Sequence, residues 1–500
     1  MLQFSESAHA ARSPGRLVPL RFRQVADDVV LLTSHFGDWV FVSPQELSTL
    51  YQGELPTELE EKLAERNFIV DRLDRRALAD RLSRKRRFLR FGPNLHILVV
   101  TLRCNETCVY CHASRADMDA VDTDMSPQTA ERCIDLALQS TSGRLTFEFQ
   151  GGEPLVNFPV MQHAIEYATE KNRAYGKEIE FTLVSNLALL DDAKLDYLVE
   201  NKVQICTSVD GPEKLHNKQR VLPSDNAFQR AARGIERINA RYLALGLDPV
   251  LYHVEALPTI TRAALDYPKE LVDTFVSLGC HSIFLRPVDP FGFAGKTQDK
   301  IEYDRKRYHE FYRSAVDYIL ERNLAGTRVL ERYAAIFLTK ILTGDDPNFL
   351  DLRSPGGAGI GQLTYNYDGS IYTSDEGRML RETGDETFRI GHVSTARYRE
   401  LMLSDTVRSL VLASNLDAQP DCVTCTYNPY CGNKPEHSYR TQGSIFGRTR
   451  ESDICAVHKG IQDYLFGKLA ENRPEIVDVF RRWTTVRERE HYLQGGATAS

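Results

Sequence analysis

The sequence predicts an α/β protein: a partial (β/α)6 barrel with a small N-terminal domain and a cysteine-rich C-terminal domain. Six apolar, strand-like segments alternate with helical patterns across residues 92–325, which predicts a parallel sheet covered by helices on its outer face. A hairpin pattern followed by two short helical patterns precedes them, within residues 1–91. Two groups of closely spaced cysteines occur, one early in the barrel region and one within residues 326–465, and residues 466–500 form a tail.

Length and composition place the chain among multidomain globular proteins. Its 500 residues exceed one ordinary hydrophobic core, and 42% hydrophobic with 26% charged residues are ordinary values. The net charge of −7 gives no case for nucleic acid as a partner. No stretch reaches the ~18 consecutive apolar residues of a membrane span, and the N-terminus shows no basic segment followed by an apolar one. We therefore expect neither a nucleic-acid nor a membrane partner, and a cytoplasmic location.

The N-terminal domain has the outline of a small winged helix. Its signals are, in order, strand runs at 29–32 and 39–42 around a Gly37-Asp38 turn, capping boxes at Ser43/Glu46 and Thr57/Glu60, and a returning strand at 68–70. This outline resembles the peptide-recognition domain of enzymes that mature ribosomally made peptides, which adds a leader peptide as a strand to its sheet edge. A DNA-reading winged helix has the same outline.

The segment that joins this domain to the barrel is strongly basic. Residues 72–90 carry nine Arg and Lys residues. A charge run of this kind is usually a solvated helix face. Docking of an acidic leader peptide or of a redox partner is the alternative interpretation.

The barrel strands are expected at 95–103, 144–150, 179–185, 203–209, 250–257 and 282–288, with a helix that opens at Ser126-Pro127. In a barrel of parallel strands the chemistry lies beyond the C-terminal strand ends. The residues that follow each strand are therefore the candidates for the chemistry of the site.

Cys104, Cys108 and Cys111 follow the first strand at C-x3-C-x-aromatic-C spacing. Three thiolates can hold three irons of a [4Fe–4S] cluster and leave the fourth iron open to a small ligand. A structural zinc site, with His112 as the fourth ligand, is also compatible with this spacing. We call these three cysteines the trio.

The second cysteine group, which we call the quartet, comprises Cys422, Cys425, Cys431 and Cys455. Four thiolates close a site completely, whether it holds an iron–sulfur cluster or zinc. The remaining cysteines, Cys133, Cys206 and Cys280, stand singly in apolar stretches and are expected to be small core residues.

A second motif, Gly151-Gly152-Glu153-Pro154, ends the second strand forty residues after Cys111. Together the trio and this motif resemble the signature of radical S-adenosylmethionine (SAM) enzymes. The resemblance implies that SAM chelates the open iron of the cluster. It also implies that the Gly-Gly-Glu-Pro segment receives the SAM amino group through backbone carbonyls and the Glu153 carboxylate.

The same resemblance assigns further residues to SAM. Ser185 and Asn186 end the third strand and Ser208 lies on the fourth, where they are implied to reach the ribose and methionine parts. Arg220 is positioned like the arginine that pairs with the SAM carboxylate, and the aromatic Tyr110 of the cysteine motif belongs to the cofactor site. Each of these residues could instead be a strand cap or a surface polar group.

The quartet resembles the SPASM domain, whose full form holds two auxiliary [4Fe–4S] clusters. Two cysteines of that pattern are missing here, because Ser374 and Pro435 stand in their places. Both missing ligands serve the nearer auxiliary cluster, so the resemblance implies one auxiliary cluster, held by the quartet. Asp375 aligns with an aspartate that accepts a proton in sulfatase-maturing relatives, although it could also cap a turn.

Taken together, the motifs resemble a radical SAM/SPASM peptide maturase, with short stretches closest to the maturase of the His-Xaa-Ser peptide system. The resemblance implies a ribosomally made precursor peptide as substrate and a low-potential electron donor of flavodoxin or ferredoxin type. Two alternatives stay open. One is an anaerobic sulfatase-type maturase; the other is a zinc-binding regulator that reads DNA through residues 17–91.

Overall fold

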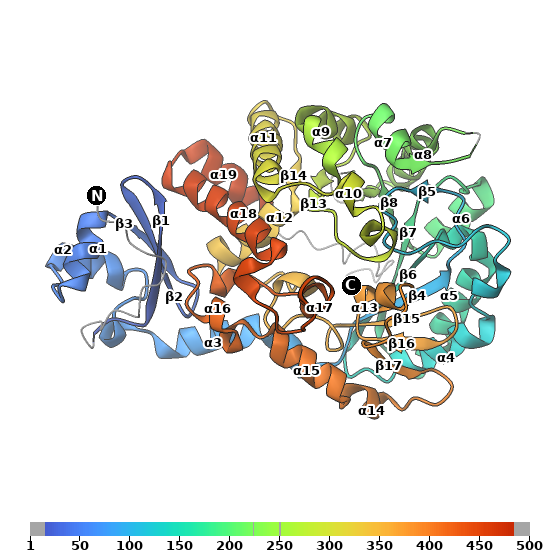
Figure 1. Ribbon diagram of the computed structural model, residues 1–500, viewed down its shortest axis with the longest axis horizontal. Helices are drawn as coiled ribbons and strands as arrows, with labels where there is room; N and C mark the ends of the chain where they lie inside the picture. Colours follow the sequence, from blue (N-terminus) through green and yellow to red (C-terminus); the bar gives the residue numbers. More distant parts are fainter. Residues whose placement is uncertain (1–15, 224, 250–251, 485–500) are drawn as a thin grey trace, which may run out of the picture.

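The computed structural model describes residues 16–223, 225–249 and 252–484. The N-terminal domain lies at one end of the molecule and the barrel at the other, with the last helices between them (Figure 1). The extreme N-terminus, the start of the fifth predicted strand and the end of the predicted tail lie outside the described residues. Within the described residues, none of the helices combines the length and apolar character that crossing a membrane requires.

The N-terminal domain is a three-stranded antiparallel sheet of order β1-β2-β3 with helices on one face. Its elements are β1 (Leu20–Ala26), β2 (Val29–Ser34), β3 (Trp39–Val42), α1 (Pro44–Tyr51), α2 (Thr57–Ala64), η1 (Val70–Arg72), α3 (Arg75–Lys85) and η2 (Arg87–Arg90). Gly37 has a φ of +86° in the β2–β3 turn, a conformation that glycine adopts without strain. The Ser43/Glu46 capping box is present.

Two local predictions for this domain differ from the structure, and one strand was not predicted. The cap of α2 is Pro56, whose carbonyl accepts the Glu60 N–H at 2.8 Å, so Thr57 lies inside the helix and forms no capping box. The returning strand is reduced to one bridge between Leu17 and Ile69. Strand β1 was missed because its polar and apolar residues do not form the apolar run that marked β2.

The barrel strands run parallel and in chain order. Their sheet has the order β10-β8-β7-β6-β4, which then continues into β15-β16-β17. The strands are β4 (Leu95–Thr101), β6 (Arg144–Gly151), β7 (Glu178–Ser185), β8 (Gln204–Ser208) and β10 (Glu255–Leu257). The helices between and after them are α4 (Pro127–Ala137), α5 (Phe158–Asn172), α6 (Asp192–Glu200), α7 (Glu213–Gln219), α8 (Ala227–Ala244), α9 (Pro268–Ser277), α10 (Gln298–Ile301) and α11 (Arg305–Leu324). The α/β fold with a mostly parallel central sheet is confirmed.

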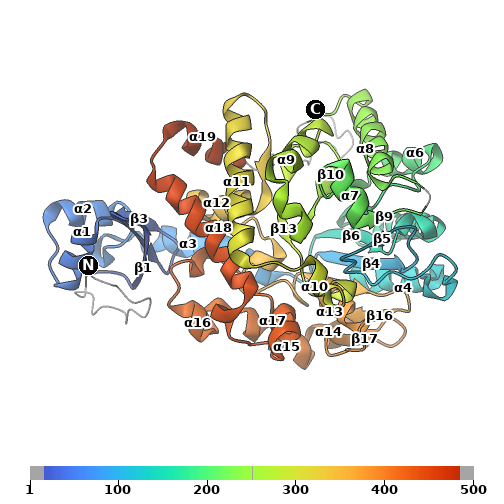
Figure 2. The ribbon, with the colours of Figure 1, turned by 45° about the horizontal axis from the view of Figure 1, so that its top comes forward.

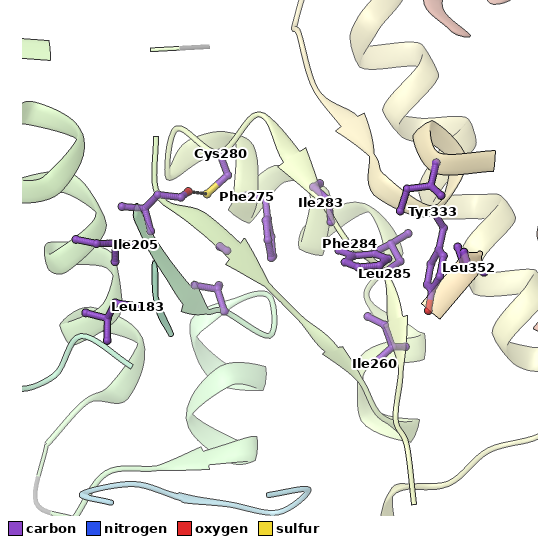
Figure 3. Close-up of a cluster of buried hydrophobic side chains, with 14 of the residues drawn as sticks. Leu183, Ile205, Ile260, Phe275, Cys280, Ile283, Phe284, Leu285, Tyr333 and Leu352 are labelled. Atoms are coloured by element: carbon purple, nitrogen blue, oxygen red, sulfur yellow. Dashed lines mark hydrogen bonds between the residues drawn. The ribbon is translucent and has the colours of Figure 1, made fainter. Parts of the chain in front are cut away.

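The sixth predicted strand is divided. Ser282–Ile283 (β12) pairs with β14 (Leu330–Glu331), and Arg286–Pro287 (β13) pairs with β11 (Thr259–Ile260). The intervening Phe284 packs edge-to-face on Tyr333, with ring centroids 4.5 Å apart. Figure 3 shows this core, in which Ile283, Phe284 and Leu285 lie between the barrel and the segment that carries Tyr333. Because the predicted strand is split in two, the chain changes direction at the buried Phe284, and Arg286 follows this fixed point.

The C-terminal part joins the barrel sheet directly. Strand β15 (Gln362–Tyr365) runs parallel to β4, so the sheet crosses the predicted boundary between barrel and C-terminal domain. The other elements are α12 (Arg332–Leu338), η7 (Thr339–Thr343), β16 (Ser370–Tyr372), α13 (Asp375–Arg381), β17 (Arg389–His392), α14 (Tyr398–Met402), α15 (Asp405–Ser414), α16 (Pro420–Val423), η10 (Asn428–Tyr430), α17 (Pro435–Gln442), α18 (Asp453–Ala470) and α19 (Pro474–Trp483).

The N-terminal sheet docks on the quartet region through its uncovered face. Trp39 and Phe41 pack edge-to-face on Phe466 of α18. Tyr430 donates from its hydroxyl to the Gly37 carbonyl at 3.1 Å. Both views place β1 beside α18 (Figure 2). The turn of the N-terminal hairpin is thereby held against the residue that precedes Cys431.

Candidate functional site

The trio lies in the loop after β4, at the C-terminal edge of the parallel sheet. Each of the three sulfur atoms faces one N–H donor. The Glu106 amide lies 3.5 Å from Cys104 Sγ, the Arg115 amide 3.5 Å from Cys111 Sγ, and the Arg220 guanidinium 3.6 Å from Cys108 Sγ. Burial raises the pKa of the Cys104 and Cys108 thiols, so an added positive charge is needed to keep them as thiolates.

The Gly-Gly-Glu-Pro segment packs backbone against backbone at the same edge. Gly151 has a φ of +139°, and a Cβ there would meet the Thr101 carbonyl at 2.1 Å. A Cβ on Gly152 would lie 2.4 Å from the carbonyl oxygens of both Leu102 and Arg103. Pro154 is buried and begins the short helix η4 (Pro154–Asn157). Only glycines allow the end of β6 to approach the residue before Cys104 this closely.

Glu153 joins three strand ends. Its carboxylate is fully buried and accepts from the Leu155 amide at 3.0 Å, from the Ser185 hydroxyl at 2.8 Å and from the Asn186 amide at 2.8 Å. Burial raises its pKa. Asn186 in turn donates from its side chain to Asn105, inside the trio loop, at 2.9 Å. Ser185 and Asn186 thus lie at the predicted site and hold Glu153 there.

A buried polar network supports the trio from behind. The Tyr110 hydroxyl donates to the Asp210 carboxylate at 2.6 and 2.7 Å, and Arg220 Nε lies 3.2 Å from the same carboxylate. The Arg220 guanidinium lies over the Tyr110 ring, 5.3 Å from its centroid, and 3.8 Å from Glu106. Strand β9 (Arg220–Val221) pairs Arg220 with Cys108 of β5 (Thr107–Cys108). The structure therefore brings Tyr110 and Arg220 to the trio, engaged with protein groups.

The inner face of the barrel is polar beside this edge. Ser208 and Cys206 share the half-buried inner face of β8, so Cys206 lines the barrel interior and is not the core residue that was predicted. Cys133 and Cys280 are buried core residues, as predicted. Side chains alternate along a strand, which puts every second β8 residue inward. Glu148 of β6 lies there too, and burial, with a contribution from the Asp375 charge, raises its pKa to about 7.

Asp375 begins α13, directly after the cap residue Ser374. Its carboxylate pairs with the buried Arg378 at 2.9 Å, and Arg378 also donates to the Ala113 carbonyl in the trio loop at 3.0 Å. The charge of Asp375 also contributes to the raised pKa of Glu148. Through Arg378, the structure therefore links Asp375 to the trio loop.

The two missing cysteine positions are neighbours in space. Ser374 donates to the Glu436 carboxylate at 2.8 Å, and Glu436 follows Pro435. Next to them, Lys434 Nζ lies 2.7 Å from Asp351 and 3.4 Å from Glu376. Ion pairs and hydrogen bonds occupy the region where the two thiolates would have stood.

The quartet comes from two segments. Cys422 lies in α16, Cys425 and Cys431 follow in the next turns, and Cys455 lies on α18. Burial raises the pKa of Cys422 to about 12, with further contributions from Cys455 and Cys425, so the thiols lie within electrostatic reach of one another. His458 Nδ1 is 3.7 Å from Cys431 Sγ, and burial lowers the pKa of His458 to about 3.

The donors around its sulfur atoms suit the trio to an iron–sulfur cluster. Each of its three sulfur atoms faces one N–H donor. N–H donors to sulfur are among the hydrogen bonds that tune iron–sulfur clusters.

Sequence reasoning missed three residues of these sites. Glu106 and Asp210 bracket Arg220, and His458 lies beside Cys431. Cys455 and His458 are three residues apart, which puts their side chains on one face of a helix. This spacing could have identified His458 from the sequence alone. Asp210, after a barrel strand end, was readable in the same way.

The comparisons with known proteins agree with this geometry. Residues 98–255 match the family model described as Radical SAM superfamily. Over 351 residues the chain is 25% identical to the cysteine-type anaerobic sulfatase-maturating enzyme of Clostridium perfringens, covering 68% of this chain and 88% of that one.

Two solved structures share the fold. Native anSMEcpe with bound AdoMet matches with a TM-score of 0.62 at 22% identity, over 76% of this chain and 98% of that one. Streptococcus suis SuiB bound to precursor peptide SuiA matches with a TM-score of 0.52 at 14% identity, over 88% and 99%. Part of the chain is therefore similar to the radical SAM superfamily. Over 68% of its length the chain is also similar to an anaerobic sulfatase-maturating enzyme.

Proposed function

We propose that this chain is a radical SAM enzyme that modifies a ribosomally made precursor peptide, with a His-Xaa-Ser peptide as its particular substrate. One observation carries the proposal: each thiol of the trio faces one N–H donor, at the strand edge where the Gly-Gly-Glu-Pro segment ends. This is an environment built for buried thiolates that share a cluster.

The residues fit a cluster and SAM in stated roles. The trio would hold the cluster, and Gly151, Gly152 and Glu153 would meet the SAM amino group. Ser208 and Arg220 would meet its ribose and carboxylate. When bound, the cluster supplies the electron that cleaves SAM to a carbon radical able to remove hydrogen. Arg220 already lies beside Cys108, so a small shift of its guanidinium would let it serve a carboxylate ligand.

Asp375 is the candidate proton acceptor. The Arg378 guanidinium at 2.9 Å holds its carboxylate in place, and the Asp375 charge contributes to the raised pKa of Glu148. A positioned carboxylate can take the proton that a substrate carbon releases as it is oxidised. Its neighbour Glu148 has a pKa near 7 and could pass that proton on.

The N-terminal sheet is the candidate site for the leader segment. Strand β3 ends the β1-β2-β3 sheet, and β1 lies against α18. An extended peptide could add to β3 by main-chain hydrogen bonds. SuiB, which shares the fold, is described with a bound precursor peptide, and this supports a peptide partner.

Anaerobic reconstitution followed by a product assay tests the proposal. Protein loaded with iron and sulfide, then given SAM, reduced flavodoxin and the peptide, should release 5′-deoxyadenosine and yield a peptide of altered mass. Absence of 5′-deoxyadenosine from fully loaded protein with peptide present would contradict it. Asp375→Asn should keep 5′-deoxyadenosine formation but lower peptide product by ~100-fold or more. The exposed Asp405→Asn is the matched control.

A sulfatase-type maturase is the second candidate. The 25% identity to a sulfatase-maturating enzyme over 68% of the chain favours it. A competition assay separates the two: a sulfatase-derived peptide with a Cys or Ser target against a His-Xaa-Ser precursor. We expect modification of the precursor, and loss of that modification when its leader is removed. Modification of the sulfatase peptide alone would favour the second candidate.

A further inference from the structure

A cavity of about 70 Å³ lies where the N-terminal hairpin, α3 and the quartet loop meet. That volume accommodates several water molecules or one small anionic group. It is lined by His35, Phe36, Leu82, Lys85, Arg86, Phe88, Lys340, Asp346, Ser354, Asp417, Asn428, Pro429 and Cys431. Cys431 belongs to the quartet, which the SPASM resemblance assigns to an auxiliary cluster, so the cavity reaches that site from outside.

The cavity carries one cation in excess. Lys340 lies 3.3 Å from Asp346, and Arg86 lies 3.3 Å from Asp417. Lys85 has no ion pair or hydrogen bond of its side chain within the described part of the chain. Burial, together with the charges of Arg81 and Lys340, lowers the pKa of Lys85 to about 8. An anionic group entering the cavity would relieve this unfavourable burial.

The surface around the cavity mouth is basic as well. α3 presents Leu78, Arg81, Leu82 and Lys85 to the protein, and its other side and η2, apart from the buried Phe88, face solvent. The exposed arginines of this stretch are Arg75, Arg76, Arg84, Arg86, Arg87 and Arg90. Arg84 and Arg86 have acidic neighbours, Asp345 at 3.7 Å and Asp417 at 3.3 Å. A basic surface stands out on a chain of net charge −7; we call it the α3 basic surface.

We infer that the α3 basic surface is the docking site of an acidic one-electron carrier protein, which exchanges electrons with the quartet site through the cavity beside Cys431. The inference rests on the proposed function and, in addition, takes the quartet as the holder of an auxiliary [4Fe–4S] cluster. One electron passes in each encounter. An anionic flavin hydroquinone is oxidised to the neutral semiquinone, with no proton released, while the cluster is reduced by one electron, and the reverse transfer unloads the cluster.

The position of the cavity favours an electron carrier over the leader peptide as partner. A leader added to β3 needs a free strand edge and gains nothing from contact with a cluster ligand. An electron carrier gains a faster transfer from this position, because electron transfer weakens steeply with distance. A carrier docked over the cavity brings its redox group close to Cys431, which lines the cavity. Complementary charge speeds such brief encounters without requiring a large interface.

The test uses the full chain with the trio replaced by alanine, so that the quartet site is the only reducible group. Arg84→Glu with Arg87→Glu reverses charge on the α3 basic surface, and Lys85→Gln removes the cation that is in excess in the cavity. Arg230→Glu with Arg233→Glu on α8, at the far end of the molecule, is the matched control (Figure 1). Rapid mixing with flavodoxin hydroquinone, followed by bleaching of the cluster absorbance, gives the second-order rate.

We expect the double reversal at α3 to lower that rate by about tenfold at low ionic strength and to flatten its salt dependence. Lys85→Gln should lower it by about threefold. The control variant should stay within twofold of the parent. The rate with methyl viologen radical, a small cation, should not fall in any variant. Flavodoxin affinity, measured by titration, should weaken in parallel.

Several results would overturn the inference. These are an unchanged flavodoxin rate in the α3 variant, an equal loss in the α8 control, or weakened precursor-peptide binding with normal flavodoxin reduction. A quartet that binds zinc and shows nothing to bleach would also overturn it. The 5′-deoxyadenosine assay on the parent chain reports separately on the proposed function, so the two failures are distinguishable.

Discussion

The two cysteine groups differ in ligand number and origin but not in burial. Burial raises the thiol pKa in both, as for Cys108 and Cys431. The trio comes from one loop at a strand edge, with an N–H donor for every sulfur. The quartet combines a loop with a helix and is flanked by His458. Three ligands leave a cubane iron open and four do not, so ligand count decides which site can bind a substrate.

The largest expected effect is the difference in SAM cleavage between two variants, each with one cysteine replaced, one from the trio and one from the quartet. Cys104→Ala should abolish 5′-deoxyadenosine formation, a loss of ~1000-fold or more, because the open iron is lost. Cys455→Ala should remove about half of the bound iron yet leave SAM cleavage within about tenfold. Iron analysis and chromatography of the nucleoside measure both. Equal losses in the two variants would contradict the division of roles.

Substitutions at two glycines test how tightly the trio site is packed. Gly152→Ala should cost about 3 kcal/mol or more in unfolding free energy, because its Cβ would meet two backbone carbonyls that cannot give way. Gly143→Ala meets nothing within 4 Å and should change stability by less than about 0.5 kcal/mol. Urea unfolding measures both. A mild effect at Gly152 would mean that the loop relaxes.

Glu148 of β6 makes the stability of the folded protein depend on pH. Its pKa is about 7 in the folded protein against 4.5 normally, mainly because of burial. The folded state thus favours the protonated acid, and this contribution is complete below pH ~4.5 and is lost as pH rises through 7. Glu148→Gln should therefore gain on the order of 2 kcal/mol over the parent at pH 8, and nothing at pH 4.5.

Urea unfolding at the two pH values checks this prediction, with the exposed Glu58→Gln as control. A gain of equal size at both pH values would show that repacking, and not ionisation, is responsible.

The smallest expected effect concerns the quartet. His458 stays neutral and lies 3.7 Å from Cys431 Sγ. Loss of one hydrogen bond worth about 1 kcal/mol corresponds to roughly 40 mV for one electron. His458→Phe should lower the cluster potential by that amount in an EPR-monitored titration. The half-exposed His163→Phe is the control, and a shift of equal size there would contradict the role.

The strands and the two cysteine groups were readable because they rest on local signals. Apolar runs predicted four barrel strands to within two residues, and Ser126 caps α4 as expected. The cap of α2 could not be predicted, because tertiary contacts decide which of two adjacent residues begins a helix. Strand β1 could not be predicted either, because tertiary contacts decide whether a segment of alternating polarity pairs with a neighbouring strand. The division of the sixth strand was hidden for the same reason, since Phe284 turns inward only to meet Tyr333.

Sequence alone determined the chemistry that the chain can carry: three thiols with one vacancy, four thiols with none, and glycines where a strand must approach the first group. These depend on residue types and spacing, which are fixed along the chain. Only the tertiary structure decided which donors face each sulfur, that Ser374 and Glu436 meet beside Lys434, and that a basic cavity reaches Cys431. Such contacts join residues dozens to hundreds of positions apart, and packing of the whole chain is what brings them together.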